Sequence, residues 1–159
     1  MAELTLPEQI LHRARFWGLR LATAESCTAG MIAAALTDPP GSSDIFDSGF
    51  VTYSNAAKTR MLGVRPATLA AHGAVSEQVA REMAEGARLA AGVGLAISVT
   101  GIAGPGGSEH KPEGRVCFGL ARDGRKTLTE TVDFGALGRD AVRRATRDHA
   151  LRLILTALD

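Results

Sequence analysis

Four functional side chains stand in a row in TAESCTAG, residues 23–30, between an apolar run and an alanine-rich one: Glu25, Ser26, Cys27 and Thr28. A serine at the start of a helix can cap it, because its side-chain oxygen accepts from free backbone amides. The same amides can stabilise an oxyanion, and Ser26 could then be a nucleophile. The local sequence favours capping by Ser26 or Thr28, so a catalytic interpretation needs support from elsewhere in the chain.

A nucleophilic serine needs a base, because a free hydroxyl is a weak nucleophile. The four histidines lie in predicted helices or loops and form no evident triad, so Lys58, in TYSNAAK (52–58), is a better candidate. If Ser54 caps a helix, Lys58 falls in its first turn, where the helix dipole opposes a positive charge and burial would lower the pKa further. Tyr53 could relay a proton or orient Lys58. The alternatives are a solvated lysine and a tyrosine packed at a strand end.

The glycine-rich stretch TGIAGPGG, residues 100–107, is another candidate for ligand binding. Glycines let backbone amides approach a phosphate or a carboxylate closely. The stretch is not a Walker A motif, because the Gly-Lys-Ser/Thr ending is missing. On its own it is a weak signal, and its glycines could serve only to make turns.

Composition narrows the class of protein. A chain of 159 residues fits a single domain, 1–159, with one well-buried core. The net charge of +1 and the 4% share of aromatic residues argue against long nucleic acid as a partner. Cys27 and Cys117 belong to no CxxC pair, so we expect neither a metal site nor a disulfide framework. Without a signal-type segment or an apolar run of the ~20 residues that a membrane span needs, we expect a cytoplasmic protein.

Local patterns predict the elements that position these residues. Thr5 and Glu8 have the spacing of a capping box, which predicts a helix from there to about Trp17. Periodicity, caps and the DG turn predict further helices at 28–37, 54–63, 76–92 and 139–158, and strands at 19–24, 46–53, 94–100, 115–122 and 126–134. This order predicts an α/β protein, a three-layer α/β/α sandwich around a mixed, mostly parallel sheet. The loops AESCT, TYSNAAK and TGIAGPGG should then meet at one cleft beyond the strand ends.

Four longer motifs occur in order along the chain: AESCTAG, PGSSDIFDSGFVTYSNAAKTRMLGV, HGAVSEQVAREMAEGARLAAG and SVTGIAGPGGSEHKPEGRV. Together they resemble the C-terminal domain of the CinA (competence/damage-inducible) family, over about residues 5 to 155. That family includes nicotinamide mononucleotide deamidases. The resemblance implies a three-layer α/β/α fold and a hydrolase that yields nicotinate mononucleotide and ammonia in pyridine nucleotide recycling.

The resemblance also implies roles for individual residues. Ser26 matches the family's nucleophile, Lys58 its base, and Tyr53 the tyrosine of the same motif. In the expected mechanism, backbone amides at the start of the 28–37 helix hold the oxyanion. The expected contacts with a small nucleotide substrate come from Cys27, Thr28, Gly41, Ser42, Ser43, Thr100, Gly101, Ala103, Gly104 and Arg139. The resemblance implies no metal, no organic cofactor and a homodimer.

Three positions depart from the family's common pattern. Ala29 stands where a glycine is common, Glu113 where a valine is common, and no aspartate precedes Arg139. The last departure weakens the expectation that Arg139 binds a phosphate. Two other readings stay open: a non-catalytic nucleotide-binding module that serves as a sensor or a partner of competence or recombination machinery, and an amidase that acts on another small amide.

Overall fold

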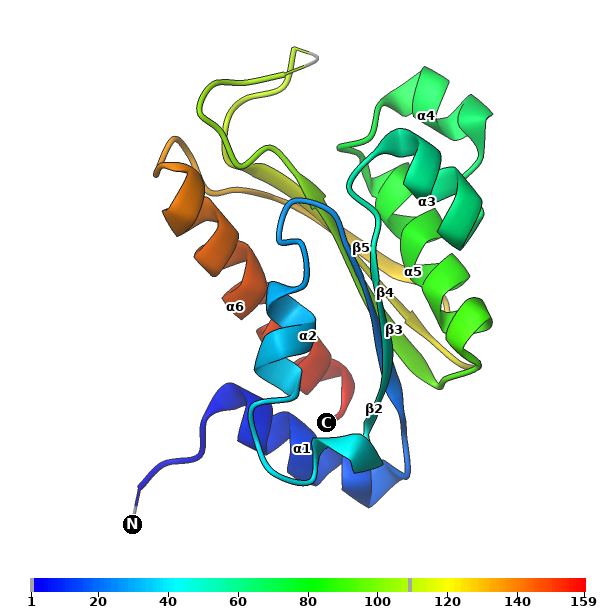
Figure 1. Cartoon of the computed structure of the whole chain (residues 1–159), viewed down its shortest axis with the longest axis vertical. Helices are drawn as coiled ribbons and strands as arrows, with labels where there is room; N and C mark the ends of the chain where they lie inside the picture. Colours follow the sequence, from blue (N-terminus) through cyan, green and yellow to red (C-terminus); the bar gives the residue numbers. More distant parts are fainter. Residues whose placement is uncertain (1, 109) are drawn as a thin grey trace.

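One mixed sheet organises the protein. The computed structural model describes residues 2–108 and 110–159, and in this part of the chain five strands pair in the order β2-β1-β3-β4-β5 (Figure 1). The strands are β1 (Leu21–Glu25), β2 (Phe46–Val51), β3 (Leu95–Gly101), β4 (Arg115–Arg122) and β5 (Leu128–Asp133). β1 pairs in parallel with β2 and β3, whereas the β3–β4 and β4–β5 pairs are antiparallel. Only β4 therefore runs against the other four strands, and the predicted α/β class with a mixed sheet is confirmed.

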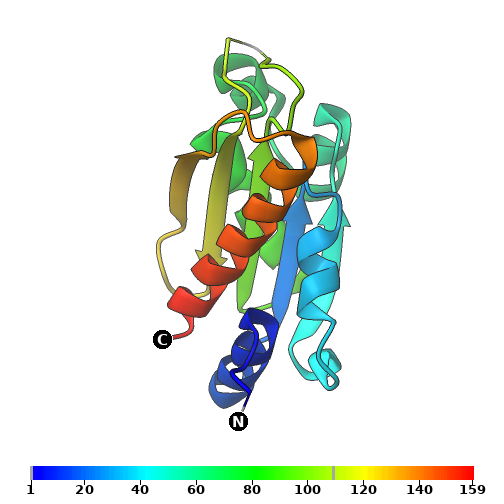
Figure 2. The same ribbon diagram turned by 90° about the vertical axis from the view of Figure 1, so that its left-hand side faces the viewer.

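Helices cover both faces of the sheet, as Figures 1 and 2 show. One layer holds α1 (Leu6–Trp17), α2 (Met31–Leu36) and α6 (Arg139–Ala157), and the other holds α3 (Asn55–Leu62), α4 (Pro66–His72) and α5 (Glu77–Ala91). The predicted three-layer sandwich is confirmed. In the described ranges, none of the helices combines the length and the apolar character that crossing a membrane requires.

Each helix layer shares a hydrophobic core with the sheet. Under α1, α2 and α6, the sheet contributes buried side chains that include Leu21, Ile97 and Phe118. Under α5, small side chains such as Ala22 and Ala96 meet the apolar stripe of the helix, which includes Met83. These two cores fix the sheet between its helices, and the strand ends are therefore held in constant relative positions.

Most helix ends follow their predicted caps. Thr5 and Glu8 form both halves of a capping box at α1. Ser54 accepts from the Ala57 amide at the start of α3, and Ser76 accepts from the Val79 amide at the start of α5. These helices therefore begin where the sequence predicts, and α3 in particular begins directly after β2.

Two segments differ from the prediction. α2 begins at Met31 rather than at residue 28, because Ala29 has φ +46° and Gly30 has φ +102°, and neither value fits a right-handed helix. The short helix α4 was not predicted; it opens with Pro66 at its first position, which is a favourable place for proline. The first difference matters for the site, because a turn takes the place of the first part of the expected helix.

Candidate active site

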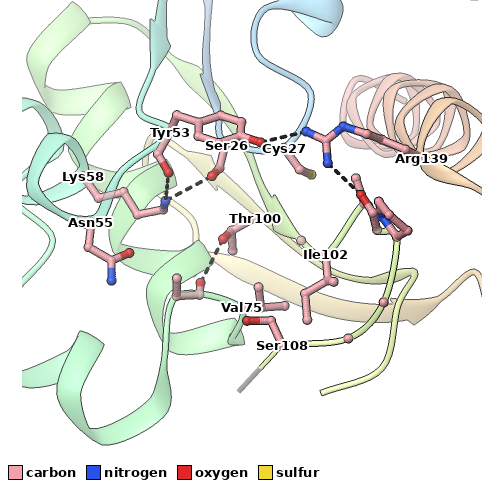
Figure 3. A pocket seen from close by; sticks show the side chains of 17 residues that line it. Ser26, Cys27, Tyr53, Asn55, Lys58, Val75, Thr100, Ile102, Ser108 and Arg139 are labelled. Atoms are coloured by element: carbon pink, nitrogen blue, oxygen red, sulfur yellow. Dashed lines mark hydrogen bonds between the residues drawn. The ribbon is translucent and has the colours of Figure 1, made fainter. Parts of the chain in front are cut away.

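A pocket of about 320 Å³ opens beyond the carboxyl ends of β1, β2 and β3 (Figure 3). The predicted convergence of the three loops is confirmed, because each of them contributes to its wall. The first residue of α6 and the segment before α5 complete the lining, which is made by Ser26, Cys27, Tyr53, Asn55, Lys58, Ala74, Val75, Thr100, Gly101, Ile102, Ala103, Gly104, Pro105, Gly106, Gly107, Ser108 and Arg139.

Ser26 and Lys58 meet in this pocket although 32 positions separate them in the chain. Lys58 Nζ lies 3.0 Å from Ser26 Oγ and also donates to the backbone carbonyl of Tyr53 at 3.2 Å. Ser26 follows β1 directly, and its amide donates to Val99 O of β3, so the sheet fixes its backbone. Lys58 lies in the first turn of α3, as predicted. The sheet and the capped helix thus aim the hydroxyl and the amine at each other.

The Lys58 amine is almost fully removed from water, since the residue is 1% exposed. This burial lowers the pKa of Lys58, because desolvation disfavours the charged form. No histidine, aspartate or glutamate is found among the described residues that line the pocket. Lys58 is accordingly the group placed to take a proton from Ser26. Within residues 2–108 and 110–159, moreover, no group of three or more His, Cys, Asp or Glu side chains could hold a metal ion.

Cys27 also lines the pocket and is another potential nucleophile there. Burial raises the pKa of its thiol to about 11, so the thiol stays protonated near neutral pH. Because the thiolate is the reactive form of cysteine, Cys27 is unsuited to attack a substrate. The geometry therefore favours Ser26, whose hydroxyl has a base within hydrogen-bond distance.

Tyr53 lies at the rim of the pocket with its side chain half exposed. Its phenol oxygen accepts from Arg139 Nη2 at 2.9 Å, while its backbone carbonyl accepts from Lys58. Tyr53 therefore orients Lys58 through a main-chain atom that any residue would supply. A relay role for the phenol stays a prediction.

The glycine-rich loop forms the opposite wall, where Thr100, Gly101, Ala103 and Gly104 line the pocket as expected. The Thr100 hydroxyl donates to Ala74 O at 2.9 Å, which leaves its lone pairs as the available acceptor. At Gly101, a side chain would collide with β4, so only glycine fits there.

Two further contacts hold the glycine-rich loop in place. Arg139 Nη1 donates to Gly104 O at 2.8 Å, so this arginine joins the loop to the rim tyrosine. Glu113 accepts from the Gly106 amide at 2.6 Å. Glu113 therefore braces the loop from within.

Four expected contact residues do not line the pocket. Gly41 precedes the short turn Ser42–Asp44, which leads into the amino end of β2, and the pocket lies at the carboxyl end. The prediction for Gly41, Ser42 and Ser43 was wrong for this pocket, because GSS comes before a strand rather than after one. The prediction that Thr28 contacts a ligand in this pocket was also wrong. Thr28 is fully buried, and its hydroxyl donates to Glu25 Oε1 at 2.6 Å.

Two amides of α2 cannot supply the oxyanion site expected at the start of the second helix. The amides of Ile32 and Ala33 donate to the two oxygens of the buried Glu25 carboxylate, at 2.9 and 3.0 Å. Glu25 thus caps α2 from seven positions before Ile32, and these amides are not free to stabilise an oxyanion. A charged residue at the end of an otherwise apolar strand was the available signal for this role.

Asn55 and Arg143 are among the residues that were not predicted from the sequence. Asn55, at the first position of α3, lines the pocket. Arg143 donates through Nε to Cys27 O at 3.0 Å and through Nη2 to Thr28 O at 3.4 Å. The signal for Arg143 was its spacing, since residues four apart share a helix face and Arg139 was already a candidate.

Comparisons with known proteins show the family of the chain and support its fold. The family model of the CinA C-terminal domain matches residues 3–158. The nicotinamide-nucleotide amidohydrolase PncC of Escherichia coli strain K12 is 49% identical over 152 residues, which are 95% of this chain and 92% of that protein. The crystal structure of the competence/damage inducible protein CihA from Agrobacterium tumefaciens is 44% identical, with a TM-score of 0.92 over 99% of each chain.

Longer relatives match as well. A CinA-like protein of Chlorobium phaeobacteroides strain BS1 is 53% identical over 146 residues, which are 89% of this chain and 34% of that protein. The chain spans about a third of the length of such relatives. Their similarity therefore concerns one part of a larger protein.

Proposed function

The chain belongs to the CinA C-terminal domain family, and on this premise we propose that it hydrolyses the carboxamide of nicotinamide mononucleotide to nicotinate mononucleotide and ammonia. The observation that carries the proposal is the contact between Ser26 Oγ and the buried Lys58 Nζ at 3.0 Å, inside a pocket. A protein that only binds a nucleotide has no use for a buried base beside a hydroxyl. The name of the E. coli relative supplies the substrate class.

In the first half of the reaction, neutral Lys58 takes the proton of Ser26 as Oγ attacks the amide carbon. The carbon–oxygen bond forms and the carbonyl oxygen becomes an oxyanion. When the intermediate collapses, the carbon–nitrogen bond breaks and ammonia leaves with the proton that Lys58 carried; if Tyr53 donates this proton instead, the Lys58 proton then passes to the Tyr53 phenolate. The product of this half is an ester between Ser26 and the nicotinate group.

In the second half, a water molecule attacks the ester and gives a proton to Lys58. The bond between the carbonyl carbon and Ser26 Oγ then breaks, and Lys58 returns the proton to the serine oxygen. The free enzyme and nicotinate mononucleotide result. This chain's own groups and water account for every proton that moves in the reaction, so the scheme assigns no step to a metal or an organic cofactor.

The nucleotide's phosphate needs a cation or backbone amides. We assign it to the wall formed by Thr100, Gly101, Ala103 and Gly104, with Arg139 as the cation and Cys27 as a further contact. Arg139 is supported by its place at the rim, where it already donates to Gly104 O and to the Tyr53 phenol. Gly138, which replaces the family's aspartate, has φ +93° and provides no side-chain cap for α6.

The setting of the enzyme follows from the family resemblance. We propose that residues 1–159 act as a single catalytic domain, in the cytoplasm, as a homodimer and in pyridine nucleotide recycling. Two measurements test the oligomeric state and the metabolic role. Sedimentation equilibrium reports the oligomeric state, and deletion of the gene should raise the cellular level of nicotinamide mononucleotide.

Ammonia release from nicotinamide mononucleotide tests the function. Replacing a catalytic nucleophile or its base costs several orders of magnitude in kcat, so Ser26→Ala and Lys58→Ala should each lose at least about 10³-fold. Cys27→Ala tests the alternative nucleophile: it should keep most of kcat because the thiol stays protonated, and the loss of its substrate contact should affect KM. Ammonia from Ser26→Ala at the wild-type rate would remove Ser26 from the mechanism. A wild-type protein that binds the nucleotide without releasing ammonia would be a binding module, and one that hydrolyses only other amides would be a different amidase.

A further inference from the structure

Arg143 reaches the reactive turn from α6, in the helix layer opposite the one that carries Lys58. It lies on α6, 116 positions after Cys27, and its guanidinium holds the carbonyls of both Cys27 and Thr28. Arg143 does not itself line the pocket. No carboxylate of the described residues forms an ion pair with Arg143, whereas its neighbour Arg144 pairs with Asp140 at 2.9 Å. Among the described residues this partly buried cation is held by two carbonyls of one turn, which is a specific arrangement because burying a charge is costly.

The turn itself follows from three anchors. Ser26 O accepts from the Ala29 amide at 3.1 Å, which closes the turn. Glu25 holds the Thr28 hydroxyl on one side, and Arg143 holds the Cys27 and Thr28 carbonyls on the other. The peptide planes that follow Cys27 and Thr28 are therefore held by a guanidinium on α6, while the Thr28 side chain is held by a carboxylate on β1.

The direction of the Cys27 amide follows from peptide geometry. In a trans peptide the carbonyl and the amide point in opposite directions. Because Ser26 O points into the turn toward Ala29, the Cys27 N–H points out of it. Within the described ranges no other residue accepts from this amide, whose one contact is with the thiol of Cys27 itself, and Cys27 lines the pocket. The amide of the residue after a nucleophile is a common oxyanion donor in serine hydrolases.

We propose that Arg143 is a positioning residue for the reaction. By holding the carbonyls of Cys27 and Thr28, it keeps Ser26 Oγ within reach of Lys58 Nζ and keeps the Cys27 amide directed at the developing oxyanion. The inference rests on the proposed serine mechanism and replaces the amides of α2 with the Cys27 amide as the donor.

Steady-state kinetics of ammonia release test this role. Arg143→Met keeps the length of the side chain but removes the donors, and we expect kcat to fall about 10- to 100-fold, the loss that a small misplacement of reacting groups produces. KM should stay within about threefold, because Arg143 does not touch the pocket. Arg144→Met is the matched control and should leave kcat within about twofold. Equal kcat values in the two variants, or a rise in KM with kcat unchanged, would overturn the proposal.

Two additions separate positioning from loss of folding. In Arg143→Ala, added guanidinium should restore part of kcat relative to the same concentration of sodium chloride, and no restoration would count against the proposal. Melting temperatures show which variants are folded at the assay temperature. If Arg143→Met and Arg143→Ala are not folded at that temperature, Arg143→Lys replaces them in the assay. The single ammonium of lysine cannot span both carbonyls, so kcat should still fall. An unchanged kcat in Arg143→Lys would overturn the proposal.

The labelling of Ser26 by a fluorophosphonate makes the inference independent of the substrate. In this reaction Ser26 Oγ bonds to phosphorus, fluoride leaves, and the serine proton passes to Lys58. Labelling followed by mass spectrometry should be about 10-fold slower or more in Arg143→Met than in Arg144→Met. Slower labelling without ammonia release by the wild type would support Arg143 while rejecting the nicotinamide substrate. Equal labelling rates would overturn the role of Arg143 even if the wild type hydrolyses nicotinamide mononucleotide.

Discussion

At the scale of single residues, the surroundings of Lys58 and Cys27 set opposite chemical roles. Both side chains are buried at the pocket, and burial favours the neutral form of each. For an amine the neutral form is the useful base, whereas for a thiol it is the unreactive acid. The same desolvation therefore supports Lys58 as a base and excludes Cys27 as a nucleophile.

The pH dependence of kcat follows from the lowered pKa of Lys58. Lys58 accepts the serine proton only when it is neutral, so the rate should fall about tenfold per unit as pH drops below this pKa. Above it the rate should level off, and the midpoint should lie below the ordinary value of 10.5. Ammonia release measured from pH 5 to 10 checks this. A rate that falls as pH rises through this range would show that Lys58 acts in its charged form.

At the scale of elements, the turn between β1 and α2 carries the reactive serine at a conformational cost. Ala29 is exposed and has φ +46°, a conformation that residues with a Cβ adopt unfavourably. A glycine at this position would adopt the same backbone conformation without that cost.

Ala29→Gly should therefore stabilise the protein by about 0.5–1 kcal/mol, after the entropy of the more flexible unfolded chain is subtracted. Ala34→Gly is the matched control, because Ala34 is an exposed residue in the regular part of α2 and glycine there should destabilise by about 1 kcal/mol. Urea unfolding of the two variants measures the difference. If Ala29→Gly were instead less stable than Ala34→Gly, Ala29 would not adopt the left-handed conformation.

The position of α3, which carries Lys58, depends on a close approach to α5. The Leu62 carbonyl of α3 lies directly against Gly86 of α5, where a side chain would overlap it. Gly86→Ala should push α3 outward and destabilise the protein by about 1–3 kcal/mol. It should also lower kcat, because Lys58 moves with the helix.

Glu85→Ala is the control for this change, since Glu85 is exposed on the same helix. It should leave both stability and kcat close to the wild type. Chemical denaturation and ammonia release measure the two effects. A Gly86→Ala variant with wild-type stability and activity would show that α3 and α5 do not need this contact.

At the scale of the whole molecule, the sequence predicted what depends on local patterns. The caps at Thr5, Ser54 and Ser76 are short-range signals, and they located three helices correctly. Alternating helices and strands predicted the layers, and the rule for strand ends predicted the pocket. The helix expected at 28–37 was partly wrong, because the left-handed turn at Ala29 and Gly30 has no strong local signal when alanine replaces glycine.

The parts that escaped prediction depend on contacts between distant segments. Arg143 reaches Cys27 across 116 positions, and the Glu25 carboxylate folds back onto the amides of α2. Their residue types are common, and their partners are backbone atoms that carry no sequence signature. The GSS segment was misplaced for a related reason: its motif lies near the second strand, but at the end away from the pocket.

Substrate geometry gives the most direct test of the central claim, which is that Ser26 attacks the carboxamide while Lys58 takes its proton. A crystal structure of Lys58→Met with nicotinamide mononucleotide would show the substrate held beside an intact but inactive serine. We predict the carboxamide carbon at about 3–3.5 Å from Ser26 Oγ, the range for a reacting pair, with its oxygen toward the Cys27 amide. A nucleotide bound in the pocket with its carboxamide directed into solvent, away from Ser26, would contradict the account.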